Sequence, residues 1–193
     1  MEYWIDMTNP TADQIEKELR RVQYRSRYRH VLKSTVYMLI TVAAIAILVA
    51  TLWLPVLQIY GGSMTPSLQD GQIVVSVKTA NFQPGDVIAF YYNNKILVKR
   101  TIAGPGDWIT MEPDGDVYVN GALLEEPYLA EKAYGICDIT FPYQVPEGML
   151  FVMGDHRSTS VDSRSTMVGC VAQEQIVGKI IFRVWPLNCF GGI

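Results

Sequence analysis

Ser63 is the residue whose type and position most suggest covalent chemistry. It lies in the run Gly61–Met64, a few residues after a long uncharged apolar stretch. A serine hydroxyl is a weak nucleophile and needs an adjacent base. The chain has two histidines, His30 in a basic segment before the stretch and His156 in a polar loop after it. A Ser-His-Asp triad would have to use His156, so a second type of base has to be considered.

A neutral lysine is that second type of base. Burial lowers the pKa of a lysine by desolvation. Lys95 follows Asn93-Asn94 in an expected turn and should be solvated. Lys99 lies in an apolar run, and strand alternation places it on one face and Arg100 on the other. We expect one of these faces to bury its cation, although spacing alone favours a Lys99 side chain that points outward.

A third group of polar residues follows the apolar run 149–153. Residues 154–164 include Asp155, Asp162, Arg157 and Arg164, together with three serines. The alternating acids and closing glutamate of a calcium loop are absent. Two arginines interleaved with two aspartates predict a self-paired network that fixes the loop.

The uncharged stretch before Ser63 predicts a membrane anchor. No charged residue occurs from Ser34 to Gln69, and residues 36–57 are almost wholly apolar. About 20 apolar residues cross the hydrocarbon core as a helix. A buried core helix would show polar positions at the helical period, and a cleaved signal peptide is usually shorter and nearer the terminus. We expect a retained transmembrane helix over residues 34–57.

The charges flanking this stretch predict its orientation. Residues 20–33 contain six basic side chains, whereas the first charge after the stretch is Asp70. Basic residues remain on the cytoplasmic side. Residues 1–33 are therefore expected in the cytoplasm of a single-pass cell-membrane protein, and residues 58–193 outside it.

The basic segment is also expected to contact anionic lipid headgroups, where each charge contributes about 1 kcal/mol. Glu16 and Glu18 interrupt the basic residues, and the anchor fixes their location. Nucleic acid is therefore not an expected partner.

Residues 58–193 are long enough for one domain with a hydrophobic core. Short runs rich in Val, Ile, Phe and Tyr are separated by turn dipeptides, which predicts a mainly β, antiparallel fold. The runs are 72–77, 87–92, 96–102, 117–119, 150–152 and 180–185. The more polar segment Glu125–Thr140 is expected to be an excursion from the sheet.

The three cysteines are Cys137, Cys170 and Cys189. Their number is odd, so at most one pair forms, and the pairing stays open. No Cys or His spacing suggests a metal site, and no metal or cofactor is expected.

These residues closely resemble the conserved motifs of type I signal peptidases. The matching motifs are, in order, Ser63-Met64 with Pro66 and Leu68, Val98-Lys99-Arg100 with Gly104–Asp107, and Gly154-Asp155 with Asp162–Arg164. A Ser-Met pair alone would be weak evidence for the family. Three motifs in the family's order, behind a membrane anchor, are strong evidence. The resemblance covers essentially the whole chain from the anchor onward, and the single span is similar to Gram-positive members.

The resemblance implies a catalytic dyad. Ser63 would be the nucleophile and Lys99 its general base, a Ser-Lys variant of acyl-transfer catalysis. Ser160 matches the family serine that hydrogen-bonds the lysine amine. Asp162 and Arg164, with Asp155, match residues that support the site.

The resemblance also implies part of an oxyanion hole. The backbone N–H of Ser63 would contribute one donor. Some members have a hydroxyl residue two positions earlier as the second donor, and Gly61 stands there in this chain. The second donor is therefore unassigned.

The substrate implied by the resemblance is an exported preprotein with small residues one and three positions before the cut. Its signal peptide would bind as an added strand, in contact with Ile59, Gly61, Gly62 and Met64. Ser63 would be acylated, the mature protein released, and the acyl group hydrolysed by water that Lys99 activates. The implied fold has two antiparallel β regions behind the membrane helix.

Two further functions remain open. One is a specialised peptidase of the same family, for pilins or a dedicated set of secreted proteins. The other is an inactive membrane-anchored β domain that serves as a scaffold. A self-cleaving repressor, which shares the Ser-Lys β fold, is excluded by the anchor. His156 stands where the family commonly has asparagine, which leaves a role for it open.

Overall fold

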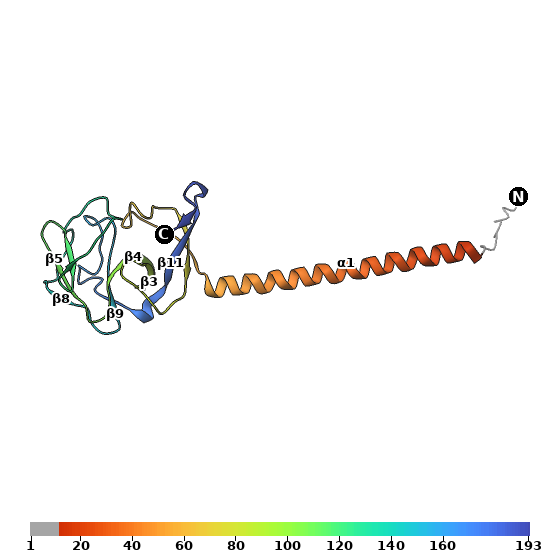
Figure 1. The fold of residues 1–193 in the computed structure, drawn as a ribbon, viewed down its shortest axis with the longest axis horizontal. Coiled ribbons are helices and arrows are strands. Elements are labelled where there is room, and N and C mark those ends of the chain that lie inside the picture. The colour runs from red at the N-terminus through yellow and green to blue at the C-terminus, as the bar shows by residue number, and fades with distance from the viewer. Residues whose placement is uncertain (1–11) are drawn as a thin grey trace. The chain divides into compact units, whose positions relative to one another are not determined.

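The computed structural model describes residues 12–193. The chain divides into two compact units, one ending at Val49 and one beginning at Ala50 (Figure 1). The first eleven residues of the predicted cytoplasmic segment lie outside the described residues.

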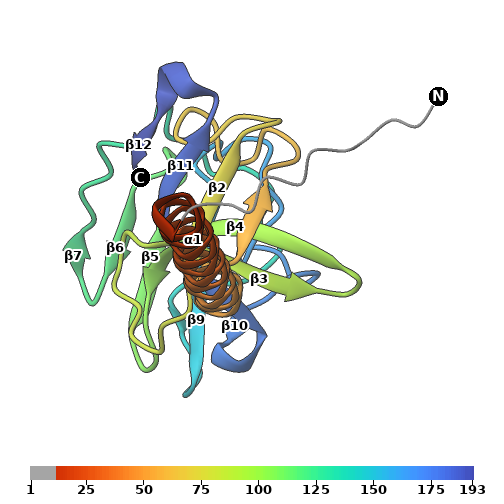
Figure 2. The ribbon, with the colours of Figure 1, turned by 90° about the vertical axis from the view of Figure 1, so that its right-hand side faces the viewer.

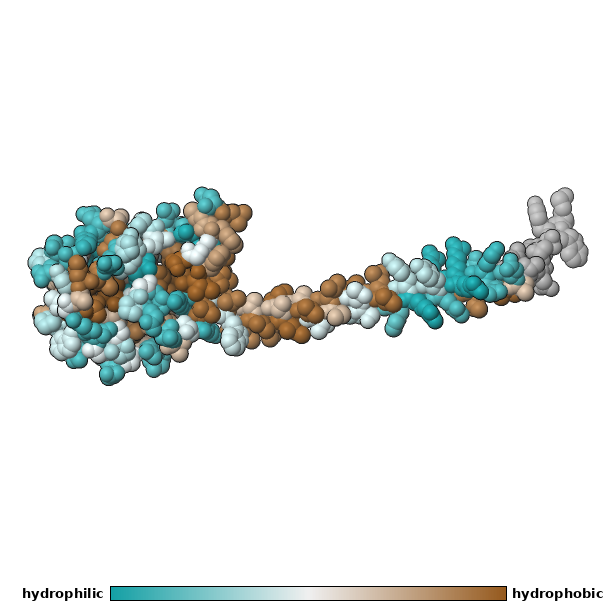
Figure 3. All heavy atoms as spheres, in the orientation of Figure 1, coloured by the Kyte–Doolittle hydropathy of each residue, from teal (hydrophilic) through white to brown (hydrophobic). Residues whose placement is uncertain are grey.

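Helix α1 runs from Ala12 to Trp53. Its part from Ile15 to Trp53 is long and apolar enough to cross a membrane, with a mean hydropathy of 2.4 in its most apolar window and no part of that window buried. Figure 3 shows hydrophilic side chains on the first half of α1 and hydrophobic ones on the second. The helix ends before the predicted boundary at Leu57, because Pro55 cannot continue it and the next residues join a sheet.

The larger sheet has eight antiparallel strands in the order β1-β2-β11-β3-β4-β9-β10, with β12 paired to β11. Its strands are β1 (Val56–Gln58), β2 (Ile73–Val77), β3 (Val87–Tyr92), β4 (Lys95–Ala103), β9 (Met149–Met153), β10 (Val171–Ala172), β11 (Ile176–Trp185) and β12 (Gly191–Gly192). Two short 3-10 helices, η1 (Gln173–Gln175) and η2 (Leu187–Cys189), flank β11.

The smaller sheet has four antiparallel strands in the order β7-β6-β5-β8. They are β5 (Trp108–Met111), β6 (Val117–Val119), β7 (Ala122–Leu123) and β8 (Tyr143–Gln144). Figure 2 shows β5, β6 and β7 on one side of the β domain and β2, β3 and β4 on the other. The expected fold class, two antiparallel β regions after an apolar helix, is confirmed.

All six strands expected from the apolar runs are present, with ends shifted by a few residues at most. Each remaining strand has two to four residues, too few for a local pattern to predict. Within Glu125–Thr140 there is no helix or strand, as expected for an excursion.

The core beneath β3 and β4 fixes the elements that hold the site. Its buried members are Ile59, Met64, Leu68, Val74, Val87, Ala89 and Ile180. Three of these lie between β1 and β2, so burying them fixes that connection against the sheet. β3 and β4 form a hairpin with Asn93 at a φ of 51°, a conformation that asparagine tolerates better than most residues.

Candidate active site

Ser63 lies in the turn that follows β1. The N–H of Thr65 donates to the carbonyl of Gly62 at 3.1 Å, and the N–H of Leu68 donates to that of Met64 at 2.9 Å. Met64, next to Ser63, and Leu68, at the end of the turn, are both buried in the core. The serine therefore sits half-buried on a backbone that packing and hydrogen bonds hold in place.

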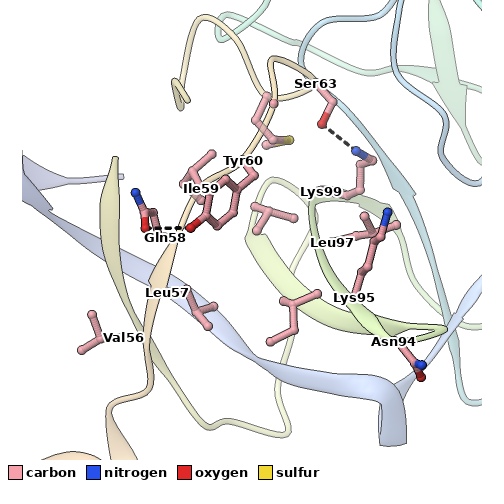
Figure 4. Close-up of a pocket in the computed structure, with 14 residues that line it drawn as sticks. Val56, Leu57, Gln58, Ile59, Tyr60, Ser63, Asn94, Lys95, Leu97 and Lys99 are labelled. Carbon is pink, nitrogen blue, oxygen red and sulfur yellow. Dashed lines mark hydrogen bonds between the residues drawn. The ribbon is translucent and has the colours of Figure 1, made fainter. Parts of the chain in front are cut away.

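Lys99 reaches Ser63 from the middle of β4. Its Nζ lies 2.8 Å from Ser63 Oγ and donates a hydrogen bond to it (Figure 4). The residue is 3% exposed. The outward orientation that spacing favoured is therefore wrong. Lys99 is covered by elements distant in sequence, such as the turn that carries Ser63. A local sequence pattern cannot show this.

The pKa of Lys99 is lowered from its ordinary value of 10.5, chiefly because burial desolvates the ammonium. The Asp162 and Asp155 carboxylates oppose this shift, and Arg164 adds to it. Both aspartates are paired with arginines, which weakens their attraction for the lysine charge. Desolvation prevails, so more of the lysine is neutral near pH 7 than in an exposed residue.

Arg100 is buried on the opposite face of β4, at 8% exposure. We expected one cation of this pair to be buried, and the structure buries both. Arg100 donates to both carboxylate oxygens of Asp155, at 2.9 and 2.6 Å, and to the carbonyl of Gly85. Its guanidinium lies 3.9 Å from the centre of the Tyr128 ring. Bidentate pairing and stacking offset the cost of burying this charge.

The loop 154–164 is only partly self-paired. Arg164 and Asp162 form a fully buried bidentate pair with two N–O distances of 2.9 Å. Asp155 pairs instead with Arg100, and Arg157 pairs with Glu126 of the 125–140 excursion. The predicted network within the loop is therefore wrong in half of its pairs, because these two side chains point toward other segments.

Ser160 does not make the hydrogen bond that the resemblance implied. Its Oγ is buried and has no hydrogen-bond partner among the described residues. It still lies in the site, because a Cβ on Gly154 would fall 2.2 Å from Ser160 Oγ and 2.5 Å from the carbonyl oxygen of Ser63. Lys99 hydrogen-bonds Ser63 instead in this structure.

His156 contributes through its backbone. Its N–H donates to the carbonyl of Ser63 at 3.0 Å, while its side chain is exposed. Any residue except proline can make this backbone contact, so no side-chain pattern could predict it. Ser158 and Thr159 are also exposed.

A groove of about 810 Å³ leads to Ser63. It is lined by residues 56–61, 63–64 and 94–99, with Val56–Tyr60 on one side and Asn94, Leu97 and Lys99 on the other (Figure 4). Of the predicted substrate-binding residues, Ile59, Gly61 and Met64 line it and Gly62 does not. The substrate-binding prediction did not include the β4 side of the groove, residues 94–99. The apolar pattern of this strand does not indicate a groove.

Two strand edges border this groove. Among the described residues, β1 pairs only with β2. β9 pairs with β4 only at Arg100, Thr101 and Ala103, which leaves the Lys95–Lys99 edge without a strand on that side. The backbone N–H of Ser63 makes no hydrogen bond to any of residues 12–193.

The three cysteines are free thiols. Burial raises the pKa of the Cys170 thiol. In the part of the chain that the structure describes, no three His, Cys, Asp or Glu residues are grouped so that they could hold a metal ion.

A buried lysine bonded to a serine, on an antiparallel β domain beside an open groove, is the arrangement of a Ser-Lys hydrolase site. The model of the family described as signal peptidase, peptidase S26, matches residues 32–185. The chain belongs to this family, and it is a serine endopeptidase that cleaves signal peptides.

Two relatives compared by sequence agree with this assignment. The chain is 38% identical to signal peptidase IB of Staphylococcus aureus (strain COL), over 68% of this chain and 78% of the relative. It is 39% identical to signal peptidase I of Bacillus caldolyticus, over 74% of this chain and 87% of the relative. A crystal structure of a signal peptidase I from Enterococcus faecalis V583 is 35% identical, covers 51% of this chain and 96% of its own, and gives a TM-score of 0.45.

Proposed function

We propose that Ser63 is the nucleophile and Lys99 the general base in the cleavage of signal peptides from exported preproteins. One observation carries this assignment: the amine of a buried lysine lies 2.8 Å from the serine hydroxyl. That separation is within the reach needed for direct proton transfer. The lowered pKa of Lys99 supplies the neutral amine that a base requires.

In acylation, neutral Lys99 takes the proton of Ser63 as Oγ attacks the carbonyl carbon of the scissile bond. The resulting lysine ammonium then protonates the leaving amine, and the mature protein departs. In deacylation, Lys99 takes a proton from water, and the hydroxide attacks the acyl-enzyme. Breakdown of this second intermediate returns the proton to Ser63 and releases the signal peptide.

The backbone N–H of Ser63 serves as one donor to the oxyanion of each intermediate. It makes no hydrogen bond to the described residues, so it is available for this role. Such donors act strongly because they are already oriented in a site with little water. Gly61 offers no side-chain hydroxyl as a second donor, and its own N–H is engaged by Asp70 at 2.7 Å.

The substrate binds as an extended strand along the groove. The Lys95–Lys99 edge of β4 provides free backbone hydrogen-bonding groups for such an added strand. Ile59 and Met64 are buried beside Ser63 and line the groove. Small residues one and three positions before the cut fit against these side chains, which agrees with recognition of small-x-small sites.

The chain is anchored in the cell membrane by α1, with its N-terminus in the cytoplasm and residues 58–193 outside. In α1 the acids lie at Asp13, Glu16 and Glu18, each paired with a nearby basic residue. Arg25, Arg29 and Lys33 follow without an ion pair among the described residues and directly precede the apolar part. These charges suit the cytoplasmic leaflet and its anionic lipids.

Cleavage of a preprotein with an Ala-x-Ala site tests the dyad. Detergent-purified wild type is compared with Ser63→Ala and Lys99→Ala, and the cut is located by mass spectrometry. We expect cleavage after the Ala-x-Ala site by wild type alone. Equal cleavage by all three proteins would exclude the proposed dyad.

Labelling of single cysteines tests the orientation. In a cysteine-free background, an impermeant thiol reagent added to intact cells should label a cysteine placed at exposed Glu174 and not one placed at Arg25. Labelling of the Arg25 position alone would reverse the proposed topology.

A dedicated rather than general substrate set remains the second candidate, and it predicts that few exported proteins accumulate as precursors when the protein is depleted.

A further inference from the structure

The groove carries one charged side chain besides Lys99. Among the residues that line the groove, the charged side chains are Lys99, bonded to Ser63, and Lys95 at the start of β4. None of the described residues that line the groove is acidic. Within residues 12–193, Lys95 makes no ion pair or side-chain hydrogen bond, and it is exposed.

Lys95 and Lys99 lie on the same face of β4, because side chains alternate along a strand. Figure 4 shows Lys95, Leu97 and Lys99 along the same side of the groove. Four residues of strand span about 13 Å. The backbone of Lys95 is therefore offset from that of Lys99 by the length of a short extended peptide.

This spacing relates Lys95 to one position of the substrate. The following step rests on the proposed binding of the substrate as an added strand. If the residue before the cut lies beside Lys99, the third residue before the cut lies beside Leu97 and the fifth beside Lys95. The third and fifth residues point the same way as the first, since the period of a strand is two.

We propose that Lys95 sets a charge preference at the fifth residue before the cut, favouring acidic over basic side chains there. A basic residue at that position meets an ammonium that has no ion pair among residues 12–193. An acidic residue gains an ion pair at the same place. The effect is modest, because the groove is open to water and exposed ion pairs are weak.

The test uses three preproteins that differ only at that fifth residue, as Glu, Gln or Lys, all with the same Ala-x-Ala site. Values of kcat/KM are measured in low salt for detergent-purified wild type, Lys95→Glu and Lys78→Glu. Lys78 is exposed and does not line the groove, so it controls for a change in overall charge. The Gln preprotein normalises each variant for its remaining activity.

We expect wild type and Lys78→Glu to cleave the Glu preprotein about fivefold faster than the Lys preprotein. Lys95→Glu should reverse this ratio, and 0.5 M NaCl should bring it toward one in each protein, because salt screens exposed charges. The same ratio in Lys95→Glu as in wild type would overturn the proposal.

Ser63→Ala separates this result from the proposed catalytic mechanism. If Ser63→Ala is inactive while the charge ratio is unchanged by Lys95→Glu, the dyad stands and the charge preference fails. If Ser63→Ala cleaves as well as wild type, the proposed dyad itself fails.

Discussion

Lys99 and Arg100 are adjacent on β4 and are buried on opposite faces of the strand. Lys99 contacts Ser63, and Arg100 pairs with Asp155. The two cations have opposite requirements. Arginine stays charged and needs a carboxylate, whereas a lysine base has to lose its proton. The structure provides the pair for Arg100 and mainly desolvation for Lys99.

The rate of cleavage should rise with pH as Lys99 loses its proton. Because the pKa of Lys99 is lowered from 10.5, we expect the rise to occur well below pH 10.5. The measurement is kcat/KM against pH in detergent, with a neutral substrate sequence around the cut. A rate that keeps rising with the ordinary lysine pKa would show that Lys99 is not the base, or is not desolvated.

Replacing Lys99 with methionine should stabilise the protein while abolishing cleavage. Between the lowered pKa of the folded state and 10.5, the unfolded chain binds more protons than the folded one. The free energy of unfolding therefore falls as the pH falls through this window. At neutral pH the buried Lys99 already lowers the stability of the folded protein. We expect Lys99→Met to raise the free energy of unfolding at pH 7 by on the order of 1 kcal/mol.

Urea unfolding in mild detergent measures this change, and the gain should shrink as the pH is raised toward 10.5. Lys95→Met is the matched control, because Lys95 is an exposed lysine on the same strand. The control should change stability by less than about 0.5 kcal/mol. A Lys99→Met protein less stable than wild type at pH 7 would contradict the argument.

Asp155→Asn should be strongly destabilising. The substitution leaves the Arg100 guanidinium buried without its carboxylate, although the Tyr128 ring and the Gly85 carbonyl remain in contact. Breaking a buried pair by removing one partner costs about 3–5 kcal/mol. Unfolding in urea should reveal this loss, while exposed Glu174→Gln should behave as wild type. Equal stability of the two variants would mean that the pair contributes little.

Ser160→Ala distinguishes a structural from a positioning role of this serine. The Ser160 hydroxyl is buried and has no hydrogen-bond partner in residues 12–193, so its removal should not lower stability. If the Ser160 hydroxyl forms a hydrogen bond with the Lys99 amine during the reaction, Ser160→Ala should lower kcat about tenfold and shift the pH–rate profile. Unchanged kcat and pH profile would show that Ser160 does not act on Lys99 in the reaction.

Gly154→Ala should disrupt the site through backbone contact. A Cβ there would approach Ser160 Oγ to 2.2 Å and the Ser63 carbonyl to 2.5 Å. The backbone that carries Ser63 would have to move, and a 1 Å displacement can lower the rate about 100-fold. At Gly191 a Cβ meets nothing within 4 Å, so Gly191→Ala is the control and should keep its activity. Comparable kcat values for both variants would contradict the close packing.

The sequence alone determined the features that depend on local pattern and composition. The uncharged stretch before Ser63 predicted an apolar helix that is present, and the apolar runs predicted six of the strands. The motifs around Ser63, Lys99 and Asp162 predicted the family, because chemically demanding positions keep their residue types and order. The predicted end of the helix at Leu57 was wrong, because Pro55 stops the helix and Trp53 is its last residue.

Tertiary structure alone decided which buried groups meet. Alternation along β4 gave Lys99 and Arg100 opposite faces, but it could not show that both faces are covered. The partners of Asp155 and Arg157 lie 55 and 31 residues away in the chain, and no spacing rule predicts them. The free edge of β4 and its groove likewise depend on where β9 stops pairing. Charge burial and strand edges are properties of packed surfaces, so they exist only after the chain has folded.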